Sequence, residues 1–192
     1  MTTLKYFTTG HSAMVLCCLL YATWWYIAFR PDADGGLLIG RNGLIFGLTF
    51  ISGLIGVMLI VLSIRNAPES TWLSVRTICI LGVLSYLALL AVTLFFFHRP
   101  VTSELLLMAA WATMEIAAIC TLFEDGALAG QSPAIPLAVV AIATIISLIA
   151  YLLYYDVDEW KAFYLGLAPL IAYAISTLIL IAYVSKAASE IP

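Results

Sequence analysis

The sequence predicts an all-α membrane protein, a bundle of about six transmembrane helices that pair into three antiparallel hairpins. Three observations predict this fold class: 64% of the residues are hydrophobic, only 10% are charged, and the mean hydropathy is +1.10. Soluble domains carry about 25% charged residues, because their outer surface faces water. A chain with this composition instead requires lipid around it. We therefore expect a multi-pass integral membrane protein in which residues 1–192 form a single transmembrane domain.

Six apolar stretches are long enough to cross a bilayer, which takes roughly 20 residues in a helix. In lipid every backbone N–H and C=O needs an internal partner. Each stretch is therefore predicted to be helical, even where β-branched residues are frequent. The predicted spans are 10–29, 43–64, 72–97, 101–123, 133–154 and 160–184.

The connections between the spans predict how the helices pair. The first, third and fifth spans each end in aromatic residues followed by charged ones, which is also common at the ends of membrane helices in general. Little more than residues 98–100 joins spans three and four, and residues 155–159 join spans five and six. Helices joined by such short loops lie antiparallel as neighbours. The pattern indicates three hairpins whose loops share one face of the membrane.

Two spans carry residues that alter the packing of a helix. The glycines Gly43, Gly47, Gly53 and Gly56 give the second span places where another helix can approach closely. Pro169 lies inside the sixth span, where its missing N–H predicts a kink or a packing irregularity.

Lysine and arginine do not orient the bundle. Positive charge is normally concentrated on the cytoplasmic side. Here four such residues fall on each face of the membrane: one face has Arg30, Arg41, Arg99 and Lys161, and the opposite face has Lys5, Arg65, Arg76 and Lys186. With six spans both termini lie on one face, but the sequence does not indicate which side of the membrane that is.

The fourth span carries the candidate pathway residues. Glu115 lies near its middle, where an ionisable group costs about 2.5–3.5 kcal/mol to insert. Glu104 precedes it by eleven residues, which returns to within about 20° of the same direction around a helix. Met108 and Trp111 lie on the same stripe. The stripe predicts a lining for a pathway or cavity.

Glu115 also has a purely structural interpretation. In that case its carboxyl group is protonated and bonds a hydroxyl group on a neighbouring helix, which holds the bundle together. The candidate partners are Ser52, Thr93, Tyr151, Ser176 and Thr177. The two carboxyl groups on the stripe are about 16 Å apart along the axis, so they do not form a catalytic pair.

A second group of candidate residues lies at the face that the hairpin loops share. It combines charged side chains with tryptophans and could form a vestibule that selects a small polar or zwitterionic solute. The alternative is a belt of interfacial aromatic residues with solvated ion pairs. The vestibule residues are Arg30, Arg99, Asp156, Asp158, Trp24 and Trp25.

Several classes of site are excluded or disfavoured by the residues present. The sequence contains no HExxH motif, which would indicate a metalloprotease, and its two isolated histidines cannot hold a pair of haems. No metal or cofactor site is predicted. The four cysteines contain no CxxC pair and are interpreted as packing residues. The net charge of −3 argues against binding to nucleic acid.

Three functions remain open, in decreasing order of support. The first is a small membrane channel or transporter for a small polar solute or cation, with Glu115 and Trp111 lining the route. The second is a non-transporting subunit or interaction module, in a homo-oligomer or a larger membrane complex. The third is an intramembrane enzyme that acts on lipid, for which no nucleophile or metal cluster is recognisable. The sequence thus favours a protein that is not an enzyme.

Overall fold

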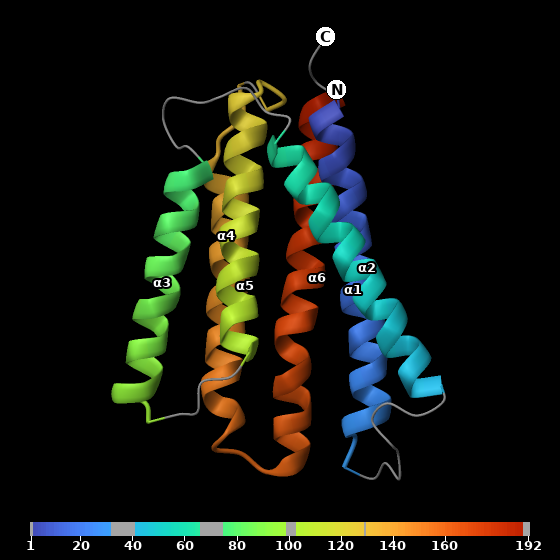
Figure 1. The fold of residues 1–192 in the computed structure, drawn as a ribbon, viewed down its shortest axis with the longest axis vertical. Helices are drawn as coiled ribbons and strands as arrows, with labels where there is room; N and C mark the ends of the chain where they lie inside the picture. The colour runs from blue at the N-terminus through green and yellow to red at the C-terminus, as the bar shows by residue number, and fades with distance from the viewer. Residues whose placement is uncertain (1, 32–40, 66–74, 99–102, 129, 190–192) are drawn as a thin grey trace.

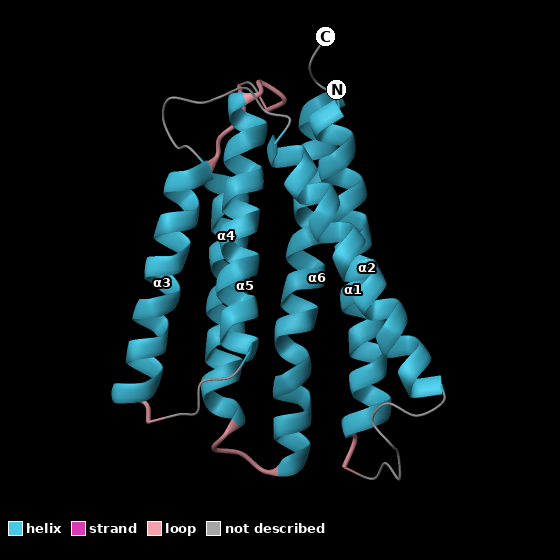
Figure 2. Cartoon of the chain, viewed as in Figure 1, coloured by secondary structure: helices cyan, strands magenta, loops and turns pink. Residues whose placement is uncertain are grey.

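A computed structural model describes residues 2–31, 41–65, 75–98, 103–128 and 130–189. Within these residues the chain forms six helices and no strand (Figure 2). Each helix is long and apolar enough to cross a membrane, which confirms the predicted fold class. The helices are α1 (Thr2–Phe29), α2 (Arg41–Arg65), α3 (Val75–Phe95), α4 (Ser103–Glu124), α5 (Ala134–Tyr154) and α6 (Glu159–Ser189).

The first helix begins earlier than its apolar stretch does. The predicted span starts at residue 10, whereas α1 starts at Thr2. Hydropathy misses these turns because they contain Thr3 and Lys5, yet Thr3 is buried and Phe7 is 0% exposed. The Ser63 hydroxyl of α2 donates a hydrogen bond to the Thr3 carbonyl at 3.2 Å. Contacts with neighbouring helices thus stabilise turns that hydropathy does not identify.

Figure 1 shows consecutive helices running in opposite directions, so that they form three hairpins. We call the end where α1, α3 and α5 finish the loop end, and the end where α1 begins and α6 finishes the terminal end. Four helices form a ring in which α4 contacts α5, α5 contacts α6, and α6 contacts α1. The second helix lies against α1 and α4, and α3 packs mainly on α4. The ring encloses the interior of the bundle.

The crossing between α1 and α2 depends on glycine. A Cβ atom on Gly10 would lie 2.9 Å from Ile60 Cγ1 and 3.1 Å from the carbonyl oxygen of Gly56. A Cβ atom on Gly53 would lie 3.0 Å from the sulfur of Cys17. Gly53 and Gly56 therefore allow the close approach that the sequence predicts, whereas nothing lies within 4 Å of a Cβ on Gly47. The hydroxyl of Ser52 donates to the Ala13 carbonyl at 2.8 Å across the same crossing.

The main core of the bundle lies toward the terminal end. It combines side chains from α1, α2, α4, α5 and α6. These side chains are almost completely covered, and most of the large apolar residues elsewhere point outward, as a lipid environment allows. The members with at most 1% exposure are Phe7, Ile60, Ala118, Ile119, Leu122, Leu128, Val140, Leu180 and Val184.

Candidate functional site

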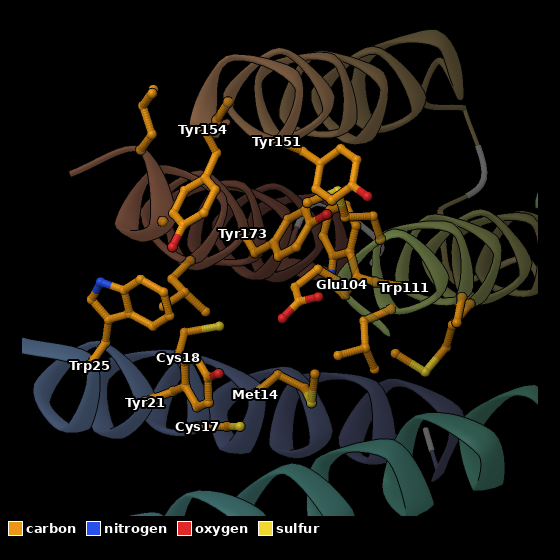
Figure 3. Close-up of a pocket in the computed structure, with 18 of the residues that line it drawn as sticks. Met14, Cys17, Cys18, Tyr21, Trp25, Glu104, Trp111, Tyr151, Tyr154 and Tyr173 are labelled. Atoms are coloured by element: carbon orange, nitrogen blue, oxygen red, sulfur yellow. The ribbon is translucent and has the colours of Figure 1, made fainter. Parts of the chain in front are cut away.

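The loop end of the ring is hollow, in contrast to the terminal end. A cavity of about 650 Å³ lies among α1, α4, α5 and α6, with Val57 of α2 at its edge. Side chains from these helices point toward one another around it (Figure 3). Its wall is mainly aromatic and apolar, and seven rings contribute to it: Tyr21, Trp25, Trp111, Tyr151, Tyr154, Tyr155 and Tyr173.

The predicted stripe on α4 meets this cavity over most of its length. Glu104, Met108 and Trp111 all line the cavity, whereas Glu115 lies one turn beyond Trp111 and does not. Trp111 stacks on Tyr173 of α6, with ring centroids 4.1 Å apart and an interplanar angle of 29°. The periodicity of α4 therefore brings three of the four predicted residues to one cavity, and Glu115 next to its inner end.

A matching stripe on α1 forms the opposite wall. Met14, Cys18, Tyr21 and Trp25 line the cavity, and their alternating spacing of four and three residues keeps them on one face of a helix. Cys17 also lines it, and the described cysteines are free thiols. The indole Nε1 of Trp25 donates to a backbone carbonyl of α6 at 3.2 Å. Trp25 is thereby fixed across the seam between the first and last helices.

Glycine at position 166 makes room for this tryptophan. A Cβ atom on Gly166 would contact the indole ring of Trp25. Pro169 lies three residues after Gly166, and α6 continues through it. Proline has no N–H for the carbonyl of Leu165, and both Leu165 and Leu170 line the cavity. The helix that carries Tyr173 thus contains both a glycine and a proline in the part that faces the hollow end.

Among the described lining residues, charge is limited to one carboxyl group. Glu104 is the acid among the described lining residues, and these residues include no lysine, arginine or histidine. Its side chain is exposed, and Figure 3 shows its carboxyl group pointing into the space between α1 and Tyr173. The cavity therefore has one negative group within an aromatic and apolar wall.

Glu115 is paired with a residue that the sequence interpretation missed. Its Oε2 lies 2.8 Å from Nε2 of His11 on α1, and both side chains are 0% exposed. The ring of His11 stacks on Phe7 with centroids 3.8 Å apart. The expected hydroxyl partners were wrong for this oxygen, and Ser52 bonds Ala13 instead. The available signal was an ionisable histidine on the same face of the first span as Met14 and Cys18.

The second ring nitrogen of His11 fixes the number of protons in the pair. Nδ1 lies 2.7 Å from the Phe7 carbonyl oxygen, which can only accept, so Nδ1 carries a hydrogen. The contact between Nε2 and Oε2 then holds one shared proton, on either atom. The pair is neutral overall in both cases, which limits the cost of burying it in a membrane. The other oxygen, Oε1, has no hydrogen-bond partner among the described residues.

The tryptophans of the predicted vestibule do not share one site. Trp25 lines the cavity, whereas Trp24 is buried at 6% exposure and packs against Tyr21 and Phe46 at ring distances of 5.2 and 4.9 Å. Successive residues on a helix point about 100° apart. Neighbours in the sequence therefore face different surroundings here.

The charged vestibule residues that the structure describes also lie apart from the cavity. Arg30 lies over the ring of Tyr26 at 5.8 Å. Asp158 accepts the backbone N–H of Lys161 at 3.0 Å and pairs with the same residue's ammonium group at 2.7 Å, which caps α6. These two bonds, the side-chain bond above all, lower the pKa of Asp158 from its ordinary value. Asp156 is exposed in the α5–α6 loop, and Arg99 lies outside the described residues.

The groups that line the cavity are few in kind. No group of three or more His, Cys, Asp or Glu residues that could hold a metal occurs within the described ranges. The cavity offers aromatic faces, tyrosine hydroxyls, thioethers, two thiols and one carboxyl group. No protein-family model matches the chain, and comparison with curated proteins and with solved structures gave no match.

Proposed function

We propose that the protein is a small membrane transporter and that the cavity binds its solute, which is a cation. The observation that carries this proposal is the position of the cavity. It extends from Glu104 at the loop end to Met14 and Met114, next to the buried His11–Glu115 pair. A carboxyl group at the loop end of a cavity whose other described lining residues carry no charge favours a positively charged solute.

The closure of the cavity at one end favours a transporter over an open channel. Beyond Trp111 the interior is filled by tightly packed side chains such as Phe7, Ile119 and Leu122, each at most 1% exposed. A channel needs a continuous path across the membrane. A transporter presents its site to one side at a time, and a cavity with a packed end is what one such state requires.

The His11–Glu115 pair fits this interpretation as a latch between α1 and α4. It links two helices of the cavity wall at the point where the hollow interior ends. Opening the terminal end would separate these helices and break the pair. Because one proton joins the two side chains, its loss or transfer provides a chemical means of favouring one state over the other.

The second candidate function is that of a non-transporting membrane subunit. Complete burial of Glu115 favours it, since a static polar contact between helices looks the same. In that case the pair only holds the bundle together, and the cavity is filled by lipid or by a partner. Transport measurements separate the two candidates.

Uptake into proteoliposomes tests the proposal. We expect vesicles that contain the purified protein to take up small ammonium or guanidinium ions faster than protein-free vesicles do. Tetramethylammonium is the first probe. Glu104→Gln should reduce the rate at least about tenfold, because the charge that attracts the cation is lost. Glu124→Gln changes the same residue type on the same helix outside the cavity, and should leave the rate unchanged.

The latch is tested in the same vesicles. Glu115→Gln preserves a hydrogen-bond donor toward His11 but cannot release the shared proton, so we expect a folded protein with an altered uptake rate. A folded wild-type protein that takes up none of the tested cations would contradict the transporter and favour the subunit.

A further inference from the structure

We propose that the solute is an organic cation with a bulky apolar body, such as a quaternary ammonium or phosphonium ion, and that it enters the cavity sideways from the bilayer. This inference rests on the proposed function, because it names the class of solute for the same cavity. Four features of the cavity carry it: its rings, its charge, its volume and an opening between helices.

The rings provide attraction for a cation without many oxygen ligands. Each of the four helices around the cavity contributes at least one aromatic side chain, for example Tyr21 from α1, Trp111 from α4 and Tyr173 from α6. The face of an aromatic ring attracts positive charge, and most strongly when the cation is desolvated. Met14, Met108 and Met114 line the cavity as well, and their flexible thioether chains adapt to apolar groups of different shape.

The balance of charge and polarity selects against small inorganic ions. An inorganic cation such as K⁺ loses its hydration shell only where several oxygens converge to replace it. This wall is mainly apolar, and its oxygens, the tyrosine hydroxyls and the Glu104 carboxyl group, are spread over the helices around the cavity. An organic cation is weakly hydrated, so it loses little hydration free energy when it enters the cavity. Glu104 supplies one counter-charge, and the described lining residues supply no positive group that would attract an anion.

The volume agrees with a solute of this kind. The cavity measures about 650 Å³, which falls within the roughly 300–1,000 Å³ typical of sites for organic ligands. A bare inorganic ion would leave most of it empty. A cation with several apolar substituents would instead bring these into contact with the rings.

The wall between α4 and the α1–α2 hairpin is open to the side. Leu107 and Ala110 of α4 and Val57 of α2 line the cavity, and all three are exposed, Leu107 at 65% and Val57 at 38%. Figure 1 shows α2 crossing α1, with its Arg41 end lying away from α4. Both edges of this window are apolar and lie within membrane-spanning helices. A lipid-soluble cation can therefore pass from the acyl chains into the cavity without crossing a polar surface.

Two ions of the same shape and opposite charge test the class of solute. Tetraphenylphosphonium and tetraphenylborate are applied to the purified full-length protein in nanodiscs, and binding is measured after subtracting the uptake of empty nanodiscs. We expect the phosphonium ion to bind at least about tenfold more tightly than the borate. This comparison needs no variant, so it does not depend on the folding of a mutant.

Variants then locate the bound ion. Glu104→Gln should weaken phosphonium binding about tenfold, a loss typical of a removed charge-assisted contact. Glu124→Gln should leave binding unchanged. Ala110→Trp narrows the window and should slow association from the lipid about tenfold, whereas Ala141→Trp, which adds the same ring at an exposed position of α5 outside the cavity, should not.

The outcomes separate this inference from the proposed function. Equal binding of the two ions, or phosphonium binding that Glu104→Gln does not weaken, overturns the class of solute. If small ammonium ions are still taken up in that case, transport stands with a different solute. If the phosphonium ion binds through Glu104 but no cation is transported, the binding class stands and the transporter is refuted.

Discussion

The hollow and the packed regions of the bundle place the same chemical group in opposite surroundings. Glu104 and Glu115 lie on one stripe of α4, yet Glu104 is exposed beside a cavity and Glu115 is 0% exposed and paired with His11. Helical periodicity sets the direction in which both side chains point. What each carboxyl group can do depends on the helices opposite it.

The size of the side chains that α1 presents explains the difference. At the terminal end Gly10 lets α2 approach until backbone atoms are in contact. Toward the loop end the inward positions hold Tyr21 and Trp25, whose rings line the cavity. Small residues bring the helices together and large ones hold them apart, so one ring of helices is packed at one end and hollow at the other.

Breaking the buried pair should have the largest effect on stability. His11→Ala leaves the Glu115 carboxyl group buried without a partner, and we expect a loss of about 3 kcal/mol in the free energy of unfolding. Glu115→Gln should lower the free energy of unfolding by about 1 kcal/mol or less, because the glutamine amide can donate a hydrogen bond to Nε2 of His11 in place of the shared proton. Unfolding by denaturing detergent in mixed micelles measures both changes.

A control variant isolates the pair from general effects of removing a histidine. His98→Asn removes an exposed histidine beyond the end of α3, and asparagine tolerates the positive φ of 51° at this position, so the free energy of unfolding should stay unchanged. Equal stability of His11→Ala and the wild type would show that the packed end does not depend on the pair.

Adding one methyl group at each end compares how much the two regions can give way. Gly10→Ala should lower the free energy of unfolding by about 2 kcal/mol, because its Cβ meets backbone atoms of α2. The nearest atoms to a Cβ on Gly166 belong to the ring of Trp25. This ring can shift into the cavity only by giving up its hydrogen bond to the Phe163 carbonyl, so we expect a loss of about 1 kcal/mol for Gly166→Ala, the size of one such bond.

The same unfolding assay reports both glycine variants. Gly47→Ala, where nothing lies within 4 Å of the new atom, is the control for the helix itself. A larger loss for Gly166→Ala than for Gly10→Ala would contradict the distinction between a packed and a hollow end.

The smallest effect is expected at the surface of the loop end. Hydrogen bonds from Lys161 lower the pKa of Asp158 below its ordinary value of 3.8. The ionised carboxylate therefore stabilises the fold above that value, and its contribution is lost as pH falls through the lower pKa of the folded state. Asp158→Asn should be slightly less stable than the wild type at pH 7, and the difference should vanish in strong acid. A difference that does not change with pH would refute an electrostatic contribution.

Local sequence patterns predicted the fold and one side of the site. Hydropathy identified all six spans, and the spacing of Glu104, Met108 and Trp111 placed them on one face, which lines the cavity. Both follow from properties of a single helix. The roles of these residues in binding remain predictions.

Features that need two helices were beyond the sequence. Nothing near Glu115 indicates that its partner is His11, 104 positions earlier. Likewise Trp24 and Trp25 are neighbours in the chain, but α2 covers the first and the cavity the second. The Lys and Arg residues are divided equally between the two faces, so the orientation in the membrane needs an experiment, such as labelling of introduced cysteines from one side.

The bond from Trp25 to the carbonyl of Phe163 spans 138 positions of the chain, and this has a consequence for biosynthesis. Synthesis delivers α1 to the membrane long before α6, so the first hairpin waits with its tryptophan uncovered. His11 likewise enters lipid before α4 brings Glu115. The cavity is therefore completed only when the last helix inserts, and a chain stalled before that point presents an unmatched histidine and an open seam to the cell's quality-control proteases.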